Sequence, residues 1–90
     1  MKIVLNRTYG GFGLSIHALA LYAMRTGHRF LYDVPRDDPD LVAVVEHLGS
    51  EANNDYSCLE VIEMPDGTEY VIVDHDGLES ALEKGHYWPS

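Results

Sequence analysis

A glycine-rich segment near the N-terminus constrains the fold of this chain most strongly. Three of the four residues at positions 10–13 are glycine, and they separate an aliphatic run, 2–6, from a run with helical spacing, 15–26. Glycine permits positive φ values, so the segment is typical of a tight turn between a strand and a helix. Ser15 has the residue type that caps a helix, and Gly27 the type that ends one. We therefore predict a strand over 2–6 and a buried helix over 15–26.

The next segments continue the alternation of strand and helix. Residues 28–34 are strand-like, and a strand, a helix and a strand in this order form a βαβ unit, which favours parallel strands. Asp38 and Pro39 then have the types preferred at the cap and first position of a helix. Apolar residues follow at spacings of three and four as far as Leu48, and Gly49 ends the pattern. These features predict a second helix with one apolar face.

The last third of the chain indicates a hairpin and a short helix. Residues 57–64 and 68–74 flank a Pro-Asp-Gly turn at 65–67, which is a strong hairpin signal. Residues 78–84 are predicted to form a short helix that Gly85 ends.

The predicted order is therefore β-α-β-α-β-β-α. It fits one small domain of the α/β (α+β) class, residues 1–90, in which helices pack on a sheet. A chain of 90 residues has room for one modest core, which excludes a cofactor domain beside a substrate domain. Tyr87 and Trp88 are expected to pack back on this domain or to be buried between subunits of a homo-oligomer.

The charge of the chain is strongly negative and unevenly distributed. Fifteen Asp and Glu residues against six Lys and Arg residues give a formal net charge of −9. Residues 1–32 hold four of the cations and no acid, whereas residues 33–90 hold all the acids and two cations. This charge argues against contact with nucleic-acid phosphates or an anionic membrane. No apolar run approaches the roughly 20 residues of a membrane span, and the N-terminus has no signal-peptide pattern.

Nine acids are candidate contacts for a basic partner. They lie around the start of the second predicted helix and along the predicted hairpin, with almost no Lys or Arg among them. Like charges on neighbouring strands destabilise a sheet, so their accumulation indicates a function. Solubility is the alternative explanation. The nine residues are Asp37, Asp38, Asp40, Glu60, Glu63, Asp66, Glu69, Asp74 and Asp76.

The glycine-rich segment is also a candidate ligand site. Backbone N–H groups at the start of a helix can bind an anion such as phosphate. The segment lacks the third glycine of a dinucleotide fingerprint and the Lys-Ser or Lys-Thr pair of a Walker loop. A tight turn with Phe12 packed in the core is the alternative interpretation. The set that would hold a phosphate is Arg7, Gly10, Gly11, Gly13 and Ser15.

Catalytic and metal-binding patterns are weak. No two of the five histidines have the spacing of a helical zinc pair. Asp74 and Asp76 share one face of a predicted strand and would be the ligands of a Mg²⁺-assisted hydrolase or nuclease, whereas a solvated strand end is the alternative. Cys58 has no cationic neighbour in the sequence to activate it as a nucleophile, so we expect it in the core. We therefore expect a protein that is not an enzyme and needs no metal or cofactor.

Several blocks of the sequence carry a family resemblance. The most specific is the run 2–7 leading into Tyr-Gly-Gly-Phe-Gly-Leu-Ser at 9–15. The other blocks are 36–42, 45–49, 59–67 and 76–79. Together they resemble a family of short proteins encoded by bacteriophages and prophages. Thr8 stands where that family commonly has cysteine, which argues against a catalytic thiol, and Ile16 and His17 stand where its members often carry acids.

The resemblance implies a phage origin, a single domain and no active site. Small acidic phage proteins often bind host machinery and place carboxylates where nucleic-acid phosphates would sit. We therefore expect a non-enzymatic inhibitor of a basic host protein complex, such as a CRISPR–Cas complex, in the cytoplasm of the bacterial host. Binding of a nucleotide or phosphate by the glycine-rich segment is the alternative function, and a homodimer is an alternative assembly.

Overall fold

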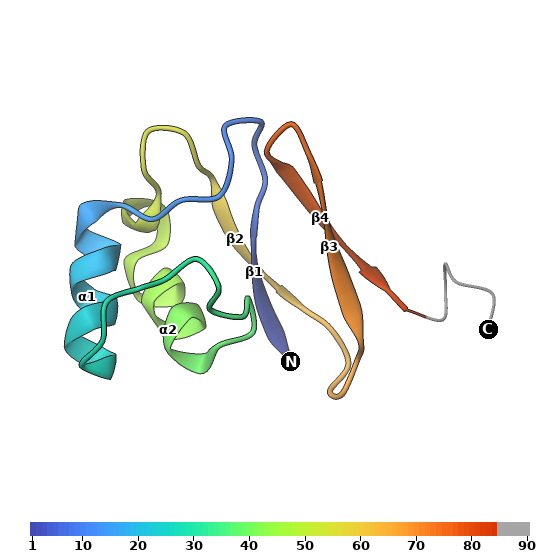
Figure 1. Cartoon of the computed structure of the whole chain (residues 1–90), viewed down its shortest axis with the longest axis horizontal. Coiled ribbons are helices and arrows are strands. Elements are labelled where there is room, and N and C mark those ends of the chain that lie inside the picture. Colours follow the sequence, from blue (N-terminus) through green and yellow to red (C-terminus); the bar gives the residue numbers. More distant parts are fainter. Residues whose placement is uncertain (85–90) are drawn as a thin grey trace.

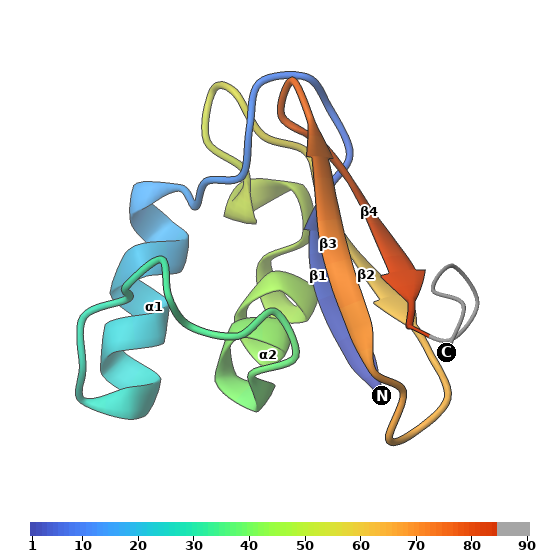
Figure 2. The ribbon, with the colours of Figure 1, turned by 45° about the vertical axis from the view of Figure 1, so that its right-hand side comes forward.

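The computed structural model describes residues 1–84, and these form three layers (Figure 1). Helices lie on one side, a two-stranded antiparallel ribbon lies in the middle, and a β-hairpin covers the other side. Figure 2 shows the hairpin strands alongside the central ribbon. The elements are β1 (Lys2–Asn6), α1 (Ile16–Thr26), α2 (Pro39–Leu48), the 3₁₀-helix η1 (Gly49–Ala52), β2 (Leu59–Glu63), β3 (Tyr70–His75) and β4 (Leu78–Glu83). The predicted class, a small domain that mixes helices with a sheet, is confirmed.

The central ribbon is covered on both of its faces. β1 pairs with β2 in antiparallel register, with Val4 opposite Val61, and both belong to the core shared with the helices. Ile3 and Leu5 point to the opposite face and are 0% and 2% exposed. The hairpin covers that second face, because β4 contacts β1. A strand buried on both faces requires a continuous aliphatic run, which explains the sequence of β1.

Both helices begin and end where the sequence predicts, but the prediction that α1 is buried is wrong, because only Ala18 and Tyr22 of this helix are buried. The Ser15 hydroxyl accepts a hydrogen bond from the Ala18 N–H, and the Asp38 carboxylate accepts one from the Leu41 N–H. Gly27 ends α1 with a φ of 75°, which glycine adopts without strain. The helices enclose one buried core, which comprises Val4, Leu14, Ala18, Tyr22, Phe30, Leu41, Val42, Val44, Val45 and Ala52.

The predicted strand over residues 28–34 is wrong. The segment is an irregular loop, and the strand pairs formed within residues 1–84 are antiparallel, so there is no βαβ unit. The apolar residues of the loop are buried without a strand: Phe30 is 6% exposed and meets Tyr22 edge-on, with ring centroids 5.2 Å apart. β1 offers this segment no edge, because β2 lies on one side and the Val4 N–H donates to the Arg36 carbonyl on the other.

The hairpin forms at a different turn from the predicted one. Residues 57–64 and 68–74 do not pair with each other, because β2 pairs with β1 and β3 pairs with β4. The tight turn is Asp76-Gly77, with φ values of 53° and 96°, as a type I′ turn requires. Asp66-Gly67 instead lies in the connection between the two layers.

β4 occupies residues 78–83, in the segment predicted as a helix. Leu78 and Leu82 have helical spacing, but they also fall on one face of a strand. The alternate residue Glu79 then points into the molecule, where it is 2% exposed. The predicted helix end at Gly85 and the predicted packing of Tyr87 and Trp88 lie outside the described residues.

Asn6 fixes the hairpin turn against β1. Its side chain is buried, and its amide group donates to the carbonyls of Thr8 and Gly77 at 2.7 and 2.6 Å. Its amide oxygen accepts from the Cys58 N–H at 2.8 Å. One side chain therefore joins the glycine-rich segment, the hairpin turn and the start of β2.

Candidate functional site

Acidic side chains from several elements gather around the start of β1. Asp66 accepts a hydrogen bond from the Met1 ammonium group at 2.6 Å. Glu46, on α2, accepts from Lys2 Nζ at 2.8 Å, and Glu63, on β2, lies opposite Lys2 in the strand register. Segments far apart in the sequence therefore bring carboxylates to one end of the central ribbon.

Two further acids belong to this group. Asp37 lines a shallow hollow together with Met1, Lys2 and Glu46. The charge of Asp37 also reaches Tyr70 at the start of β3, where burial and this charge raise the pKa of the phenol above its usual 10.0. Glu69 immediately precedes Tyr70. We call the group the N-terminal acidic cluster, which comprises Asp37, Glu46, Glu63, Asp66 and Glu69.

The N-terminal acidic cluster keeps a negative excess at neutral pH. The hydrogen bond and charge of Glu46 raise the pKa of Lys2 above its usual 10.5, and the terminal ammonium lowers the pKa of Asp66 below its usual 3.8. Lys2 and Asp66 therefore stay charged at pH 7, and the exposure of the two ion pairs keeps their contribution to stability small. The five carboxylates outnumber the cations there, even when Lys84, whose N–H donates to the Glu69 carbonyl, is included.

The structure does not bring all nine predicted contacts to one patch. Asp37, Glu63, Asp66 and Glu69 belong to the N-terminal acidic cluster, and Glu60 is exposed farther along β2.

The other four predicted contacts have separate positions. Asp38 caps α2, and Asp40 forms an ion pair with Arg25 at 3.3 Å. Asp74 and Asp76 lie at the hairpin turn, close to the glycine-rich segment and away from Met1. The nine carboxylates are therefore dispersed over several elements, and Asp40 lies beside the C-terminal end of α1.

Glu46 is a member of the cluster that sequence reasoning missed. Its position on the polar side of a correctly predicted helix was the available signal, but nothing in the local sequence indicates that Lys2 lies beside it. The contact depends on α2 packing against the end of β1, which is a tertiary feature.

Glu79 is the acid most firmly held by the fold, and it too was not singled out. Its carboxylate accepts from Arg36 Nη1 and Nη2 at 2.5 and 2.8 Å, and from the Asn6 N–H at 2.8 Å. The guanidinium of Arg36 in turn lies over the Phe12 ring, with Cζ 3.8 Å from the ring centroid. The ion pair is bidentate and Glu79 is buried in it, so Glu79 is a structural residue that a partner cannot reach.

The glycines of the N-terminal segment have structural reasons to be small. A Cβ atom on Gly10 would overlap the backbone carbonyl of Tyr56, and one on Gly13 would overlap the side-chain amide of Asn54. Gly11 has a φ of 98°, which L residues rarely adopt. Close packing of this segment on the loop before β2 therefore accounts for the glycine pattern without a phosphate.

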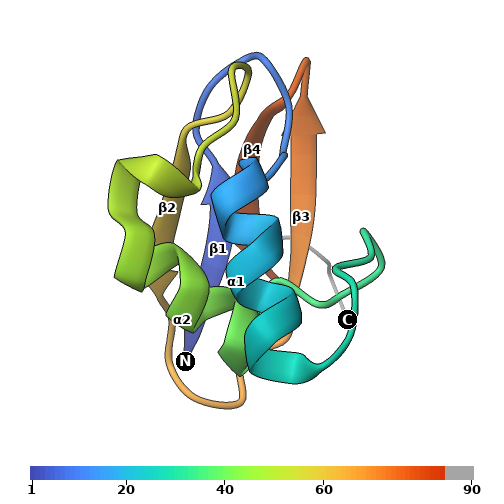
Figure 3. The same ribbon diagram turned by 90° about the vertical axis from the view of Figure 1, so that its left-hand side faces the viewer.

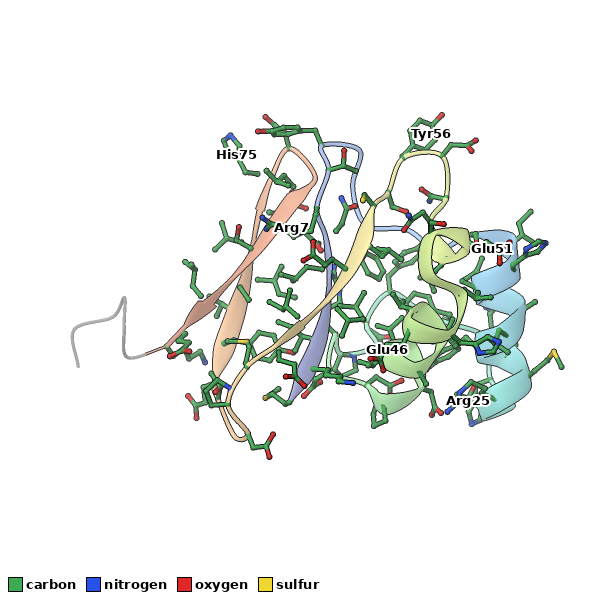
Figure 4. All side chains as sticks on the ribbon, turned by 180° about the vertical axis from the view of Figure 1, so that it is seen from behind. Arg7, Arg25, Glu46, Glu51, Tyr56 and His75 are labelled. Atoms are coloured by element: carbon green, nitrogen blue, oxygen red, sulfur yellow. The ribbon has the colours of Figure 1, made fainter. Side chains whose placement is uncertain are left out.

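The residues proposed to hold a phosphate are not gathered at the start of α1. Arg7 Nη1 donates to the Glu79 carbonyl on β4 at 2.5 Å. The Ser15 hydroxyl donates to the Glu51 carbonyl at 2.6 Å and caps α1. Figure 4 shows Arg7 beside the hairpin and Glu51 beside the helices, on different sides of the molecule.

The Mg²⁺ pair and the buried cysteine of the sequence interpretation do not fit the structure. Asp76 lies in the turn rather than on the strand face of Asp74, whose Oδ1 accepts from the Gly77 N–H at 2.7 Å. Among residues 1–84, no group of three or more His, Cys, Asp or Glu side chains is arranged to hold a metal ion. Cys58 is exposed instead of lying in the core, because its backbone joins the ribbon while its side chain points outward.

Comparison with known proteins found no match: no family model, no curated protein and no solved structure is significantly similar to this chain. Neither α1 nor α2, the helices of the described part, is long and apolar enough to cross a membrane.

Proposed function

We propose that this protein is a non-enzymatic accessory protein of phage origin that binds and inhibits a basic host protein complex. The N-terminal acidic cluster is the main contact. Glu60, Asp74 and Asp76 extend the same negative field along β2 and the hairpin. A CRISPR–Cas effector fits as the partner, because its guide–target duplex lies in a positively charged channel.

The observation that carries this proposal is how the fold uses its cations. Arg25 is paired with Asp40, and the partly buried Arg36 is paired with the buried Glu79. Arg7 is bonded to the hairpin backbone. These three arginines are therefore committed to the interior or to other elements, and they leave the carboxylates around Met1 with too few counter-charges.

The proposed mechanism is electrostatic competition with nucleic acid. Carboxylates gathered at one end of the ribbon attract a cationic groove over a distance of about 10 Å at moderate salt and speed the encounter. Once bound, they occupy positions where phosphates would otherwise sit. Such a mechanism requires an exposed charged surface and a stable scaffold, both of which 90 residues can provide.

The test is inhibition of defence in a bacterial host with an active CRISPR–Cas system. Expression of the wild-type protein is expected to restore plaque formation by a targeted phage. Asp37→Lys is expected to reduce the number of plaques at least tenfold relative to the wild-type protein, because like charges at a contact cost several kcal/mol. The matched control is Asp33→Lys, which makes the same change at an exposed residue of the same loop outside the cluster. Equal protection by Asp37→Lys and wild type would refute the contact, and no protection by wild type against any such system would refute the proposed function.

A further inference from the structure

The outer face of α1 is apolar and uncovered. Ile16, Ala20 and Met24 follow one another at intervals of four residues, so they form a stripe along one side of the helix. Ile16 is 82% exposed and Met24 81% exposed. Figure 3 shows α1 as the outermost element on this side, with the rest of the described chain behind it. Single exposed apolar residues are ordinary, but an aligned stripe marks an interaction surface.

The helix α1 itself carries no acid, which is unusual in a protein of charge −9, and the acids nearest to it flank its two ends. Residues 1–32, which include all of α1, contain no Asp or Glu. Two copies of a strongly negative protein repel each other least where neither presents a carboxylate. The N-terminal acidic cluster lies around the start of β1, and α2 lies between β1 and α1 (Figure 1). The charge distribution therefore favours a second copy of this chain as the occupant of the stripe.

The two ends of α1 carry complementary charges. Asp55 lines the hollow beside Ile16 at the N-terminal end, and Glu51 is bonded there through its carbonyl to Ser15. Arg29 is exposed just after the C-terminal end of the helix. Figure 4 shows Glu51 and Arg25 at opposite ends of α1. With a rise of about 1.5 Å per residue, these ends are roughly 16 Å apart.

We propose that two copies associate through α1, with the helices antiparallel about a two-fold axis near Ala20. Ile16 of each copy then packs on Met24 of the other, and the small side chain of Ala20 lets the helices approach closely at the centre. The same symmetry brings Arg29 of each copy to Asp55 of the other, so the charge contact is made twice. The N-terminal acidic clusters remain free in this dimer.

The dimer is expected to be weak and reversible. One pair of short helices buries less than the ~800 Å² per partner of a standard interface, and interfaces of this size are typical of transient association. Association through α1 does not depend on the proposed function, because it uses none of the cluster residues.

Sedimentation of the whole chain over a range of concentrations tests the proposal. The wild type is expected to shift from monomer towards dimer as its concentration rises. Ala20→Glu places like charges at the two-fold axis and is expected to raise the dissociation constant at least tenfold. Ser80→Glu, which adds the same charge on the exposed side of β4, is the control and is expected to leave it unchanged. A wild type that stays monomeric throughout, or a dimer that survives Ala20→Glu, would overturn the proposal.

A charge swap tests the antiparallel arrangement and does not depend on the helix core. Arg29→Glu is expected to weaken the dimer, since it places two acids together at each end of the interface. Adding Asp55→Arg to that variant restores opposite charges and is expected to recover the wild-type dissociation constant to within about twofold. Thermal melting of each variant confirms that the monomer is folded. If the double variant is as weak as Arg29→Glu, the arrangement is wrong.

Discussion

A single buried carboxylate, Glu79, largely decides how the hairpin joins the rest of the molecule. It is held by Arg36 and by the backbone of Asn6, so the outer layer, the loop before α2 and β1 meet at one group. A charged side chain at this depth is tolerated because both carboxylate oxygens have charged partners. Sequence reasoning could not find the pair, since the segment that holds Glu79 is predicted to be a helix and nothing in the local sequence links it to Arg36.

At this same scale we predict that Glu79→Ala lowers the free energy of unfolding by about 3–5 kcal/mol. The loss is large because the substitution leaves the guanidinium of Arg36 buried without its partner. Glu60→Ala, which removes an exposed acid from β2, is expected to change the value by less than about 0.5 kcal/mol. Urea unfolding of the two variants and the wild type measures both effects. Similar losses in the two variants would mean that the buried pair does not hold the hairpin.

At the scale of elements, local signals located the helices and failed on the strand pairing. Asp38-Pro39 and Gly49 correctly located the start and the end of α2, because capping depends on neighbouring residues alone. The Asp-Gly sequence occurs at both 66–67 and 76–77, so turn chemistry could not choose between them. Which of the two forms the hairpin turn depends on which strand faces are buried. The aliphatic run of β1 has to be buried on both faces, by the helices on one side and by the hairpin on the other. Residues 28–34 are the opposite case. Their apolar character does not indicate a strand, because Phe30 is buried in the core from an irregular loop.

The packing of the glycine-rich segment on the loop before β2 leads to a prediction about stability. Gly10→Ala is expected to cost about 3 kcal/mol, because its new methyl group would overlap the Tyr56 backbone, which cannot turn aside as a side chain could. Gly67→Ala is expected to cost only about 1 kcal/mol, because it has a φ of 79° but open space around it. Chemical unfolding of both variants gives the comparison. An equal or smaller loss for Gly10→Ala would show that the segment does not pack as described.

At the scale of the whole molecule, charge is unevenly distributed. The helix α1 carries no acid, whereas the carboxylates lie on α2 and its flanking segments, on the ribbon and on the hairpin. The sequence showed the imbalance between its halves, but the segregation on the surface depends on tertiary contacts that use up Arg25 and Arg36. Of the nine predicted contacts, Asp38 and Asp40 make contacts within the fold, since Asp38 caps α2 and Asp40 pairs with Arg25.

The affinity of the purified protein for the CRISPR–Cas effector that it inhibits in the plaque assay, measured over a series of salt concentrations, tests the central claim most directly. The wild-type affinity is expected to fall steadily as salt rises, because exposed charges are screened. Asp37→Lys combined with Glu69→Lys, at two exposed positions of the N-terminal acidic cluster, is expected to bind at least tenfold more weakly at low salt and with a flatter salt dependence. A variant with the wild-type affinity and the wild-type slope would contradict the claim that these carboxylates make the contact.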